Sequence, residues 1–289
     1  MPEHAEIKIS SEFFNKVAVK KTFNKISKSE KSKVKTDITV LNDKEFTIKS
    51  ITQGKEMKLI FITKKVLEVR EMIINFGMSG TFLYVNKNAP ERAKEKALKH
   101  SHLRFHDTDG GILAFYDVRR FGKWHWVESG AWGKGRGVDP IQEFQTFKER
   151  IYKYKNTHKS FKKPIHEVLL NQTWFNGVGN YLRAEILYRI PNLNPFTIAN
   201  EITDANWELI LDTTKQCCTD AFYLQGGYEI GTGNKSVNNM EGWHKVYGQK
   251  SASWVTINGR RFWFDSKWNS AITETHKKRK YSLFGEKDI

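Results

Sequence analysis

The first residues of the chain could bring a nucleophile and a proton carrier side by side. The chain begins Met-Pro-Glu, and an initiator methionine before a small residue such as proline is normally removed. Pro2 would then carry a free secondary amine, whose pKa lies below that of lysine, so that more of it is unprotonated at neutral pH. This amine can attack an aldehyde-level carbon to form an iminium, while the carboxylate of Glu3 carries protons. Glu6 follows three residues later, on the same face of a helix expected over residues 3–19.

A second candidate site is a phosphate-binding turn within residues 169–189, which read LLNQTWFNGVGNYLRAEILYR. An apolar helix should end near residues 171–172, after which Gly177 and Gly179 allow a tight backbone turn. A new helix should begin at Asn180, so its unpaired backbone N–H groups and the Asn180 amide can bind a phosphate. The alternative is a plain helical hairpin with a glycine turn, which is common in all-α proteins.

The charge of the chain points to a polyanionic partner. Its 289 residues carry a net charge of +16, with a pI of about 9.6. We therefore expect nucleic acid as the partner ahead of an acidic membrane. Most of the cations are lysine, which suits phosphate contact without reading of the base sequence. A lysine-rich solubilising surface would give the same excess of charge.

Composition excludes several classes of protein. With 39% hydrophobic and 28% charged residues, the chain is too apolar to be disordered and long enough for one large domain or two. No apolar run approaches the roughly 18 residues of a membrane span, and the N-terminus lacks the apolar core of a signal peptide. Cys217 and Cys218 are adjacent, so no disulfide framework is expected. We therefore expect an intracellular, reducing compartment, which would be the nucleus in a eukaryotic host.

The first half of the chain fits one helix followed by an antiparallel β-structure of about eight strands, either a sandwich or a barrel. Residues 87–101 are charged and polar and indicate a surface excursion, and residues 109–111 indicate a turn between the last two strands. The eight predicted strands are short and rich in Val, Ile, Phe and Thr: Ile38–Leu41, Phe46–Ile51, Lys58–Ile62, Val66–Met72, Ile73–Phe76, Thr81–Val85, His102–His106 and Ile112–Tyr116.

The second half changes to helical periodicity after a glycine-rich stretch at residues 130–137. Four helices are predicted, the last with Thr203 or Asp204 as its N-cap: residues 141–154, 163–171, 178–188 and 204–222. The predicted fold class is α+β and multidomain. Its parts are a helix and β-sandwich domain at 1–130, a linker at 131–140, a helical domain ending in a β-hairpin at 141–274, and a basic disordered tail at 275–289.

The string Gly-Val-Gly-Asn-Tyr-Leu-Arg-Ala-Glu-Ile-Leu at 177–187 resembles the helix–two-turn–helix of the formamidopyrimidine-DNA glycosylase / endonuclease VIII family. Other landmarks of that family follow in order along residues 2–264, nearly the whole chain. They are Pro2-Glu3, Gly54-Lys55, Phe76-Gly77-Met78-Ser79-Gly80, Lys99-His100-Ser101-His102 and Asp117-Val118-Arg119-Arg120-Phe121-Gly122.

The resemblance implies a role for each matching residue. Pro2 would be the Schiff-base nucleophile at the sugar C1′, Glu3 the acid/base that helps to open the sugar, and Glu6 would assist them. Lys55 would contact phosphate and assist elimination, and Asn180 would hold a phosphate. The segment containing His100 would contact DNA. The residues implied to fill the gap left by an everted base are Met78, Arg119 and Phe121; core packing is the alternative for Met78 and Phe121.

The chain departs from most of the family at its C-terminal end. Most members carry a zinc finger with two Cys-x-x-Cys pairs, which this chain lacks, so we expect no structural zinc site. Instead, Asn258-Gly259 between apolar arms predicts a two-residue hairpin within about 244–266. This resembles the zincless-finger, endonuclease VIII-like branch, in which the arginine matching Arg260 contacts a phosphate beside the lesion. Arg261 is the rival candidate.

The function implied is a bifunctional DNA glycosylase/AP lyase of base excision repair. It would remove oxidised pyrimidines, formamidopyrimidines and hydantoins, and then cleave the strand by β,δ-elimination. Its partner would be damaged DNA, double- or single-stranded, with no membrane. We expect a monomer that needs neither cofactor nor metal, because the iminium itself is the electron sink. Two alternatives are a non-catalytic damaged-DNA-binding protein of the same fold, and an RNA-binding or ribosome-associated helix–two-turn–helix protein. The β-rich first half and the Pro-Glu start disfavour the latter.

Overall fold

The structure is a computed structural model that describes residues 2–65, 67–226 and 240–272. The sequence of Tyr228–Asn239 is rich in glycine and polar residues, which indicates a loop. This segment and the basic tail expected from Thr275 lie outside the described residues. The chain forms two compact units, which are described separately: the first contains residues 2–134 and 224–226, and the second contains residues 135–223 and 240–272. Within the described residues, no helix is long and apolar enough to cross a membrane.

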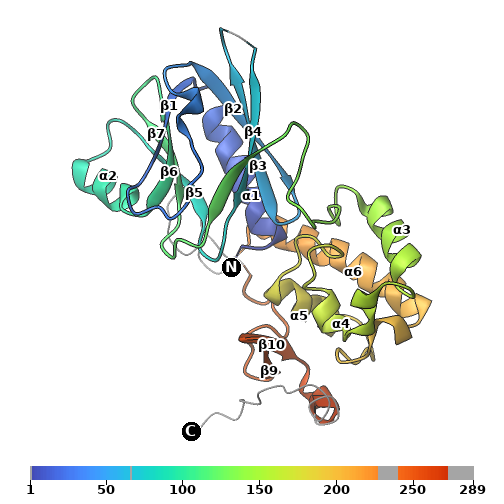
Figure 1. Ribbon diagram of the computed structural model, residues 1–289. Helices are drawn as coiled ribbons and strands as arrows, with labels where there is room; N and C mark the ends of the chain where they lie inside the picture. Colours follow the sequence, from blue (N-terminus) through green and yellow to red (C-terminus); the bar gives the residue numbers. More distant parts are fainter. Residues whose placement is uncertain (1, 66, 227–239, 273–289) are drawn as a thin grey trace. The chain divides into compact units, whose positions relative to one another are not determined.

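The first unit is built on an eight-stranded antiparallel sheet in the order β5-β7-β6-β1-β2-β3-β4-β8 (Figure 1). Two four-stranded halves meet where Phe23 of β1 pairs with Phe46 of β2. The strands are β1 (Phe23–Lys28), β2 (Phe46–Gln53), β3 (Glu56–Thr63), β4 (Val69–Asn75), β5 (Thr81–Val85), β6 (Ser101–Asp107), β7 (Ile112–Tyr116) and β8 (Lys123–Val127).

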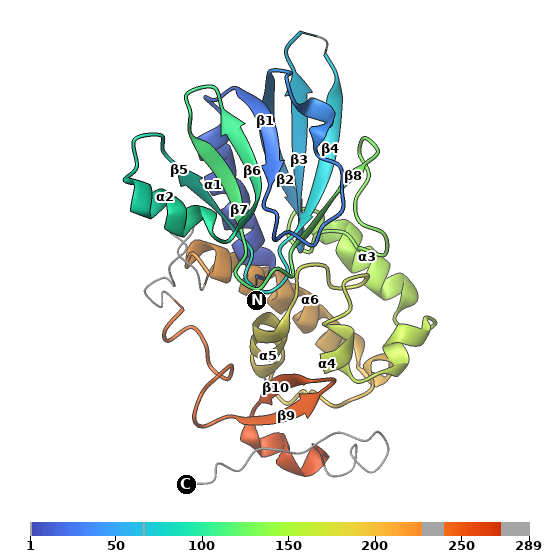
Figure 2. The same cartoon turned by 60° about the vertical axis from the view of Figure 1, so that its left-hand side comes forward.

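The two halves face each other over a core rich in phenylalanine. Phe61 of β3 lies 5.9 Å from Phe105 of β6, ring centre to ring centre, so side chains from both halves interdigitate. The helix α1 (His4–Ala18) lies against both halves (Figures 1 and 2). Its Phe14 packs on Phe82 of β5, and its Asn15 accepts a hydrogen bond of 2.7 Å from the Ser50 N–H of β2. The predicted sandwich of about eight strands is confirmed.

Several element predictions in this unit were wrong. Residues 38–41 form no strand but the 3₁₀ turn η1 (Thr39–Leu41), because the Asp37 carboxylate accepts the Thr39 N–H and bends the chain. The two strands expected at 66–76 are the single strand β4. The strands β1 and β8 were not predicted. The surface excursion at 87–101 contains the short exposed helix α2 (Glu91–Leu98).

The second unit is mainly helical, as expected, although its first helices are shorter than predicted. Its helices are α3 (Phe144–Tyr154), α4 (Ile165–Val168), α5 (Asn180–Tyr188) and α6 (Asp204–Tyr223), with 3₁₀ turns η2 (Lys159–Lys162), η3 (Ala199–Glu201) and η4 (Ser266–Trp268). Before α6, the Thr203 hydroxyl accepts the Asn206 N–H, which makes Thr203 the cap. The helix predicted to Asn171 ends at Val168, because Asn171 and Gln172 bond to the backbone of the following turn instead.

The predicted hairpin is present as β9 (Ser253–Ile257) and β10 (Arg260–Phe264). Ile257 pairs with Arg260 across a two-residue turn. Both turn residues, Asn258 and Gly259, have positive φ angles of 50° and 73°. A type I′ turn requires this conformation at both positions, and Asn-Gly adopts it at low cost.

Candidate active site and nucleic-acid interface

Strand register brings the predicted site residues of the first unit to one edge of its sheet. β2 turns into β3 between Gln53 and Glu56, and Asn75, the last residue of β4, pairs with Lys123, the first of β8. Figures 1 and 2 both show the N-terminal end of α1 at this edge. The predicted site residues in the loops at these strand ends are Lys55, Met78, His100, Arg119 and Phe121, and Pro2, Glu3 and Glu6 lie at the start of α1.

Glu3 and Glu6 hold each other at the start of α1. The Glu3 side chain accepts the backbone N–H of Glu6, and the Glu6 carboxylate accepts the Glu3 N–H at 2.8 Å. This reciprocal capping box satisfies two donors that a helix start leaves open. Both carboxylates are buried, at 1% and 4% exposure, and Pro2 beside them is buried too. The backbone of Gly226 packs on Glu6, since a Cβ added there would lie 2.7 Å from its Oε1.

Lys55 lies in the two-residue turn that joins β2 to β3. Gly54 precedes it with a φ of +55°, which suits the first position of a type II′ turn. The next residue, Glu56, is 3% exposed and its carboxylate accepts hydrogen bonds from Asn75 Nδ2 at 2.8 Å and Gly133 N at 3.0 Å. The buried Glu56 therefore fixes the base of the turn that carries Lys55.

Met78, Arg119 and Phe121 form one exposed cluster, which we call the wedge cluster. Met78 is 39% exposed and Phe121 is 54% exposed, so neither belongs to the core. The Arg119 guanidinium lies 3.5 Å from the Met78 sulfur and 5.7 Å from the Phe121 ring centre. Two apolar side chains and a cation at the tips of two neighbouring loops fit insertion into a gap in stacked bases.

Asp117 holds the two loops of the wedge cluster together. It is 1% exposed, and its carboxylate accepts the Ser79 hydroxyl and the backbone N–H of Gly122 at 2.7 Å. Gly77 must be a glycine here, because it has a φ of +62° and an added Cβ would lie 2.6 Å from the Phe121 carbonyl carbon. One buried carboxylate thus ties loop 76–80 to turn 117–122.

His100 lies beside the same turn, where its carbonyl oxygen accepts the Asp117 N–H at 2.9 Å. Burial lowers the pKa of His100, and the neighbouring cations Lys99, Lys31 and Arg120 lower it further. A positive potential of this kind attracts phosphate groups.

In the second unit, Asn180 joins the start of α5 to the hairpin. Its Nδ2 donates to the backbone carbonyl of Arg261 at 2.7 Å, and its Oδ1 accepts from Arg183 Nη2 at 2.5 Å. Arg183 is 1% exposed and also donates to the His166 carbonyl at 3.2 Å. Asn180 and the Arg260–Arg261 strand start are therefore brought together, as a shared phosphate site requires.

The hairpin is anchored by its aromatic residues. Phe262 is fully buried, stacks on His166 at 4.8 Å and lies under the Arg183 guanidinium at 4.5 Å. Arg261 is exposed but lies over the Trp254 ring at 4.5 Å, whereas Arg260 extends from the turn exposed to solvent. Of the two arginines, Arg260 is the one whose guanidinium is not engaged by an aromatic ring among the described residues.

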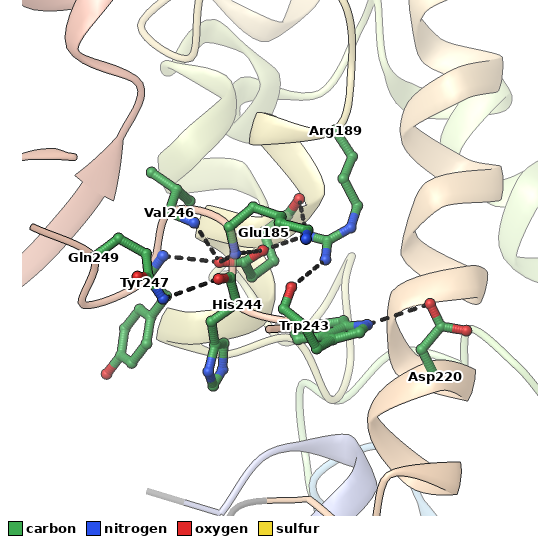
Figure 3. A network of polar contacts seen from close by, with 9 residues as sticks. Glu185, Arg189, Asp220, Trp243, His244, Val246, Tyr247 and Gln249 are labelled. Carbon is green, nitrogen blue, oxygen red and sulfur yellow. Dashed lines mark hydrogen bonds and ion pairs between the residues drawn. The ribbon is translucent and has the colours of Figure 1, made fainter. Parts of the chain in front are cut away.

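A buried carboxylate on α5 holds the segment that leads to the hairpin. Glu185 is fully buried and accepts the backbone N–H groups of Lys245, Val246 and Tyr247 at 2.8–3.1 Å (Figure 3). Arg189 pairs with this carboxylate and also donates to the Trp243 carbonyl at 2.7 Å. Among the described residues, no group of three or more His, Cys, Asp or Glu side chains could hold a metal ion.

The sequence profile of the formamidopyrimidine-DNA glycosylase N-terminal domain matches residues 1–124, and that of its H2TH (helix–two-turn–helix) domain matches residues 137–232. The chain belongs to the formamidopyrimidine-DNA glycosylase / endonuclease VIII family. It is 32% identical to human endonuclease 8-like 1 over 310 residues, covering 97% of this chain and 76% of the relative. It is 28% identical to a formamidopyrimidine-DNA glycosylase of Streptococcus pneumoniae, covering 86% and 88%.

The fold agrees with that family. The Lactococcus lactis glycosylase, solved with a DNA containing an oxidised pyrimidine, superposes with a TM-score of 0.72 at 23% identity, covering 92% of this chain and 99% of the other. The family is one of DNA glycosylases of base excision repair, so the chain is an enzyme of that class. Within this fold, sequence reasoning assigned no role to Asp117, Arg183 or Glu185, because no local pattern marks a charged residue as buried.

Proposed function

We propose that this chain removes oxidised bases from DNA and then cleaves the strand at the resulting abasic sugar. The substrates would be oxidised pyrimidines, formamidopyrimidines and hydantoins in double- or single-stranded DNA. The observation that carries the proposal is the buried Glu3–Glu6 pair directly beside Pro2, on the sheet edge that also bears Lys55 and the wedge cluster. The protein would act as a monomer.

In the proposed reaction, the secondary amine of Pro2 attacks C1′ once Met1 has been removed. The C1′–base bond breaks, the base leaves with a proton, and an iminium joins Pro2 to the opened sugar. Glu3 carries the proton that opens the sugar ring. Loss of a C2′ proton then breaks the bond to the 3′ phosphate, and a second elimination breaks the bond to the 5′ phosphate. Lys55 assists these eliminations.

The remaining residues would hold the DNA. The wedge cluster would fill the space left by the everted base, and His100 would contact the backbone beside it. In the second unit, Asn180 and Arg260 would bind phosphate groups, for which an amide N–H and an exposed guanidinium are suited. When a base is everted, the protein must hold both the opposite strand and the phosphates on either side of the base. This requirement explains why several residues are proposed to contact the DNA.

Borohydride trapping tests the proposal. The protein is mixed with an oligonucleotide carrying thymine glycol, and separately with one carrying an abasic site, and borohydride reduces any iminium to a stable amine. We expect a covalent adduct on both, mapped to Pro2. A chain with a permanent N-terminal extension is the matched control, because its Pro2 nitrogen is an amide and forms no adduct. Absence of adducts from a chain whose N-terminus is confirmed as Pro2 would leave a DNA-binding protein without this chemistry.

A further inference from the structure

The segment 31–36 carries three exposed lysines at alternate positions, in an irregular stretch that follows a turn at residues 29–32. Lys31, Lys33 and Lys35 are exposed, whereas the residues between them, Ser32 and Val34, are half-buried, and Val34 packs on the phenylalanine core. The alternating exposure places the three lysines on the solvent side of the segment, with consecutive lysines at most about 7 Å apart along the backbone. Long flexible side chains at this spacing can reach neighbouring phosphates of one nucleic-acid strand.

The segment is held in this shape by its inward-facing side. The Ser29 N–H donates to the His102 carbonyl at 3.2 Å, and the Thr36 hydroxyl donates to the Trp124 carbonyl at 2.8 Å. The backbone between them is therefore fixed to β6 at one end and to β8 at the other. Lys28 is used internally, since its ammonium donates to the Val34 carbonyl. The three outward lysines are thus displayed by a fixed backbone.

Further cations lie beside this row. Ser32, Lys33 and Val34 line a small cavity together with Arg120 and Trp124. Burial is the largest cause that lowers the pKa of His100, and the positive charges of Lys31 and Arg120 lower this pKa further. Arg120 belongs to the turn that carries the wedge cluster, so the lysine row continues from that cluster along the edge of the sheet.

Glu30 precedes the row and Asp37 follows it, but neither carboxylate forms an ion pair with its lysines among the described residues. The Asp37 carboxylate accepts the Thr39 N–H and hydroxyl at 2.9 and 2.8 Å. The Asp117 carboxylate is similarly occupied by Ser79 and Gly122.

We propose that Lys31, Lys33 and Lys35 form a phosphate track that holds a DNA strand beyond the gap filled by the wedge cluster. Lysine ammonium groups bind phosphates as point charges and read no base sequence. The track would therefore raise affinity for any DNA, damaged or not, and would contribute nothing to the chemical step. This inference deepens the proposed function and rests on it for the identity of the strand.

The test compares two triple variants of equal charge. The first is Lys31→Gln, Lys33→Gln and Lys35→Gln. The control is Lys20→Gln, Lys44→Gln and Lys87→Gln, whose exposed lysines lie at the opposite end of the sheet, around the start of β1. The ends of β1 are roughly 17 Å apart, which exceeds the screening length of about 8 Å at physiological salt.

The measured quantity is the dissociation constant for undamaged duplex DNA as a function of salt. If all three lysines contact phosphates, the slope of log affinity against log salt falls in magnitude by about 2.7 in the first variant. We expect the control slope to change by less than about 0.5. Equal changes in both variants, or no change in the first, would overturn the phosphate track.

A second readout separates this inference from the proposed function. The single-turnover rate of base excision at saturating protein should be the same in the wild type and the first variant, because the track does not touch the reacting atoms. A selective loss of that rate would also overturn the inference. If the wild type excises no base at all, the proposed function fails, while the salt dependence on undamaged DNA still decides the phosphate track.

Discussion

The Asn180 side chain and the Arg261 backbone are joined by a hydrogen bond of 2.7 Å. The bond uses one of the two hydrogens on the Asn180 amide nitrogen, and Arg183 fixes the amide from the other side through Oδ1. The second hydrogen can still reach a phosphate. One side chain can therefore bind DNA and hold the hairpin that carries Arg260.

Asn180→Ala and Asn180→Asp should separate these two tasks. The alanine variant leaves the buried Arg183 guanidinium without one acceptor and should lower the free energy of unfolding by about 1–3 kcal/mol. The aspartate can still accept from Arg183, but it cannot donate to Arg261 and it repels phosphate. It should therefore weaken DNA binding more than it destabilises the fold. Urea unfolding and DNA titration check both. An aspartate variant that binds like the wild type would exclude Asn180 as a phosphate ligand.

Arg260→Ala and Arg261→Ala form a second matched pair. Arg260 extends from the hairpin turn, whereas Arg261 lies on Trp254. Arg260→Ala should weaken DNA binding by about 1.5–3 kcal/mol, because it removes one charge-assisted hydrogen bond to a phosphate. Arg261→Ala should bind nearly normally. Both variants should fold, because Phe262 anchors the hairpin. The reverse order of effects in a DNA titration would assign the phosphate to Arg261.

Glu185→Gln should destabilise the second unit. The wild-type carboxylate accepts three backbone N–H groups and pairs with Arg189 (Figure 3). A glutamine at this position turns its NH₂ group toward those donors and leaves Arg189 without a partner charge. We expect a loss of about 3 kcal/mol in the free energy of unfolding, measured in urea. Glu149→Gln, on the exposed face of α3, is the control and should change it little. Equal midpoints for the two variants would contradict the proposed role of Glu185.

The sequence predicted those elements that are determined by residues close together in the chain. The Asn258-Gly259 turn and the amphipathic pattern of α1 identified their elements because turn chemistry and periodicity act within a few residues. β1 was missed because its burial does not alternate along FNKISK, and its pairing with β6 depends on residues far along the chain. The β-branched residues of 38–41 suggested a strand, yet the short-range bond from Asp37 prevailed.

The residues of the candidate site also fall into two groups, those that the sequence could indicate and those that it could not. Pro2, Glu3, Lys55 and the residues of the wedge cluster could be proposed as site residues because their motifs resemble a known family. The residues that position them could not. Asp117 bonds to Ser79, 38 residues away, and Glu185 bonds to Val246, 61 residues away. Their burial results from tertiary contacts, which residue type and spacing do not reveal.

The ion pair between Lys58 and Glu71 should make stability depend on pH. The two charges lie 2.8 Å apart and are almost fully buried. Burial opposes ionisation of Glu71, but bonds from Lys58, Gly130 N–H and Ser129 hold its pKa below the usual 4.5. A carboxyl group whose pKa is lower in the folded protein than in the unfolded chain stabilises the folded protein in its ionised form. This stabilisation is complete at a pH above the unfolded pKa and is lost as the pH falls through the folded pKa.

The free energy of unfolding should therefore fall as the pH is lowered below about 4.5. The comparison is a double variant, Lys58→Met with Glu71→Gln, which removes both charges and leaves neither one buried alone. Its stability should fall less steeply over the same acid range in urea unfolding at a series of pH values. Parallel curves for the two proteins would show that this pair does not contribute.

Glu3→Gln should separate base excision from strand cleavage. The glutamine oxygen can still accept the Glu6 N–H, and the backbone N–H of residue 3 can still donate to Glu6, so the start of α1 should remain capped. What is lost is the proton carrier, which should slow excision of a damaged base by about 10²–10⁴-fold. The Pro2 amine remains, so a pre-formed abasic site should still be cleaved in part and trapped by borohydride. Glu12→Gln, on the exposed face of α1, is the control and should retain both activities. Normal excision by a folded Glu3→Gln protein would move the acid/base role to another group, whereas loss of both activities together with folding would reduce Glu3 to a helix cap.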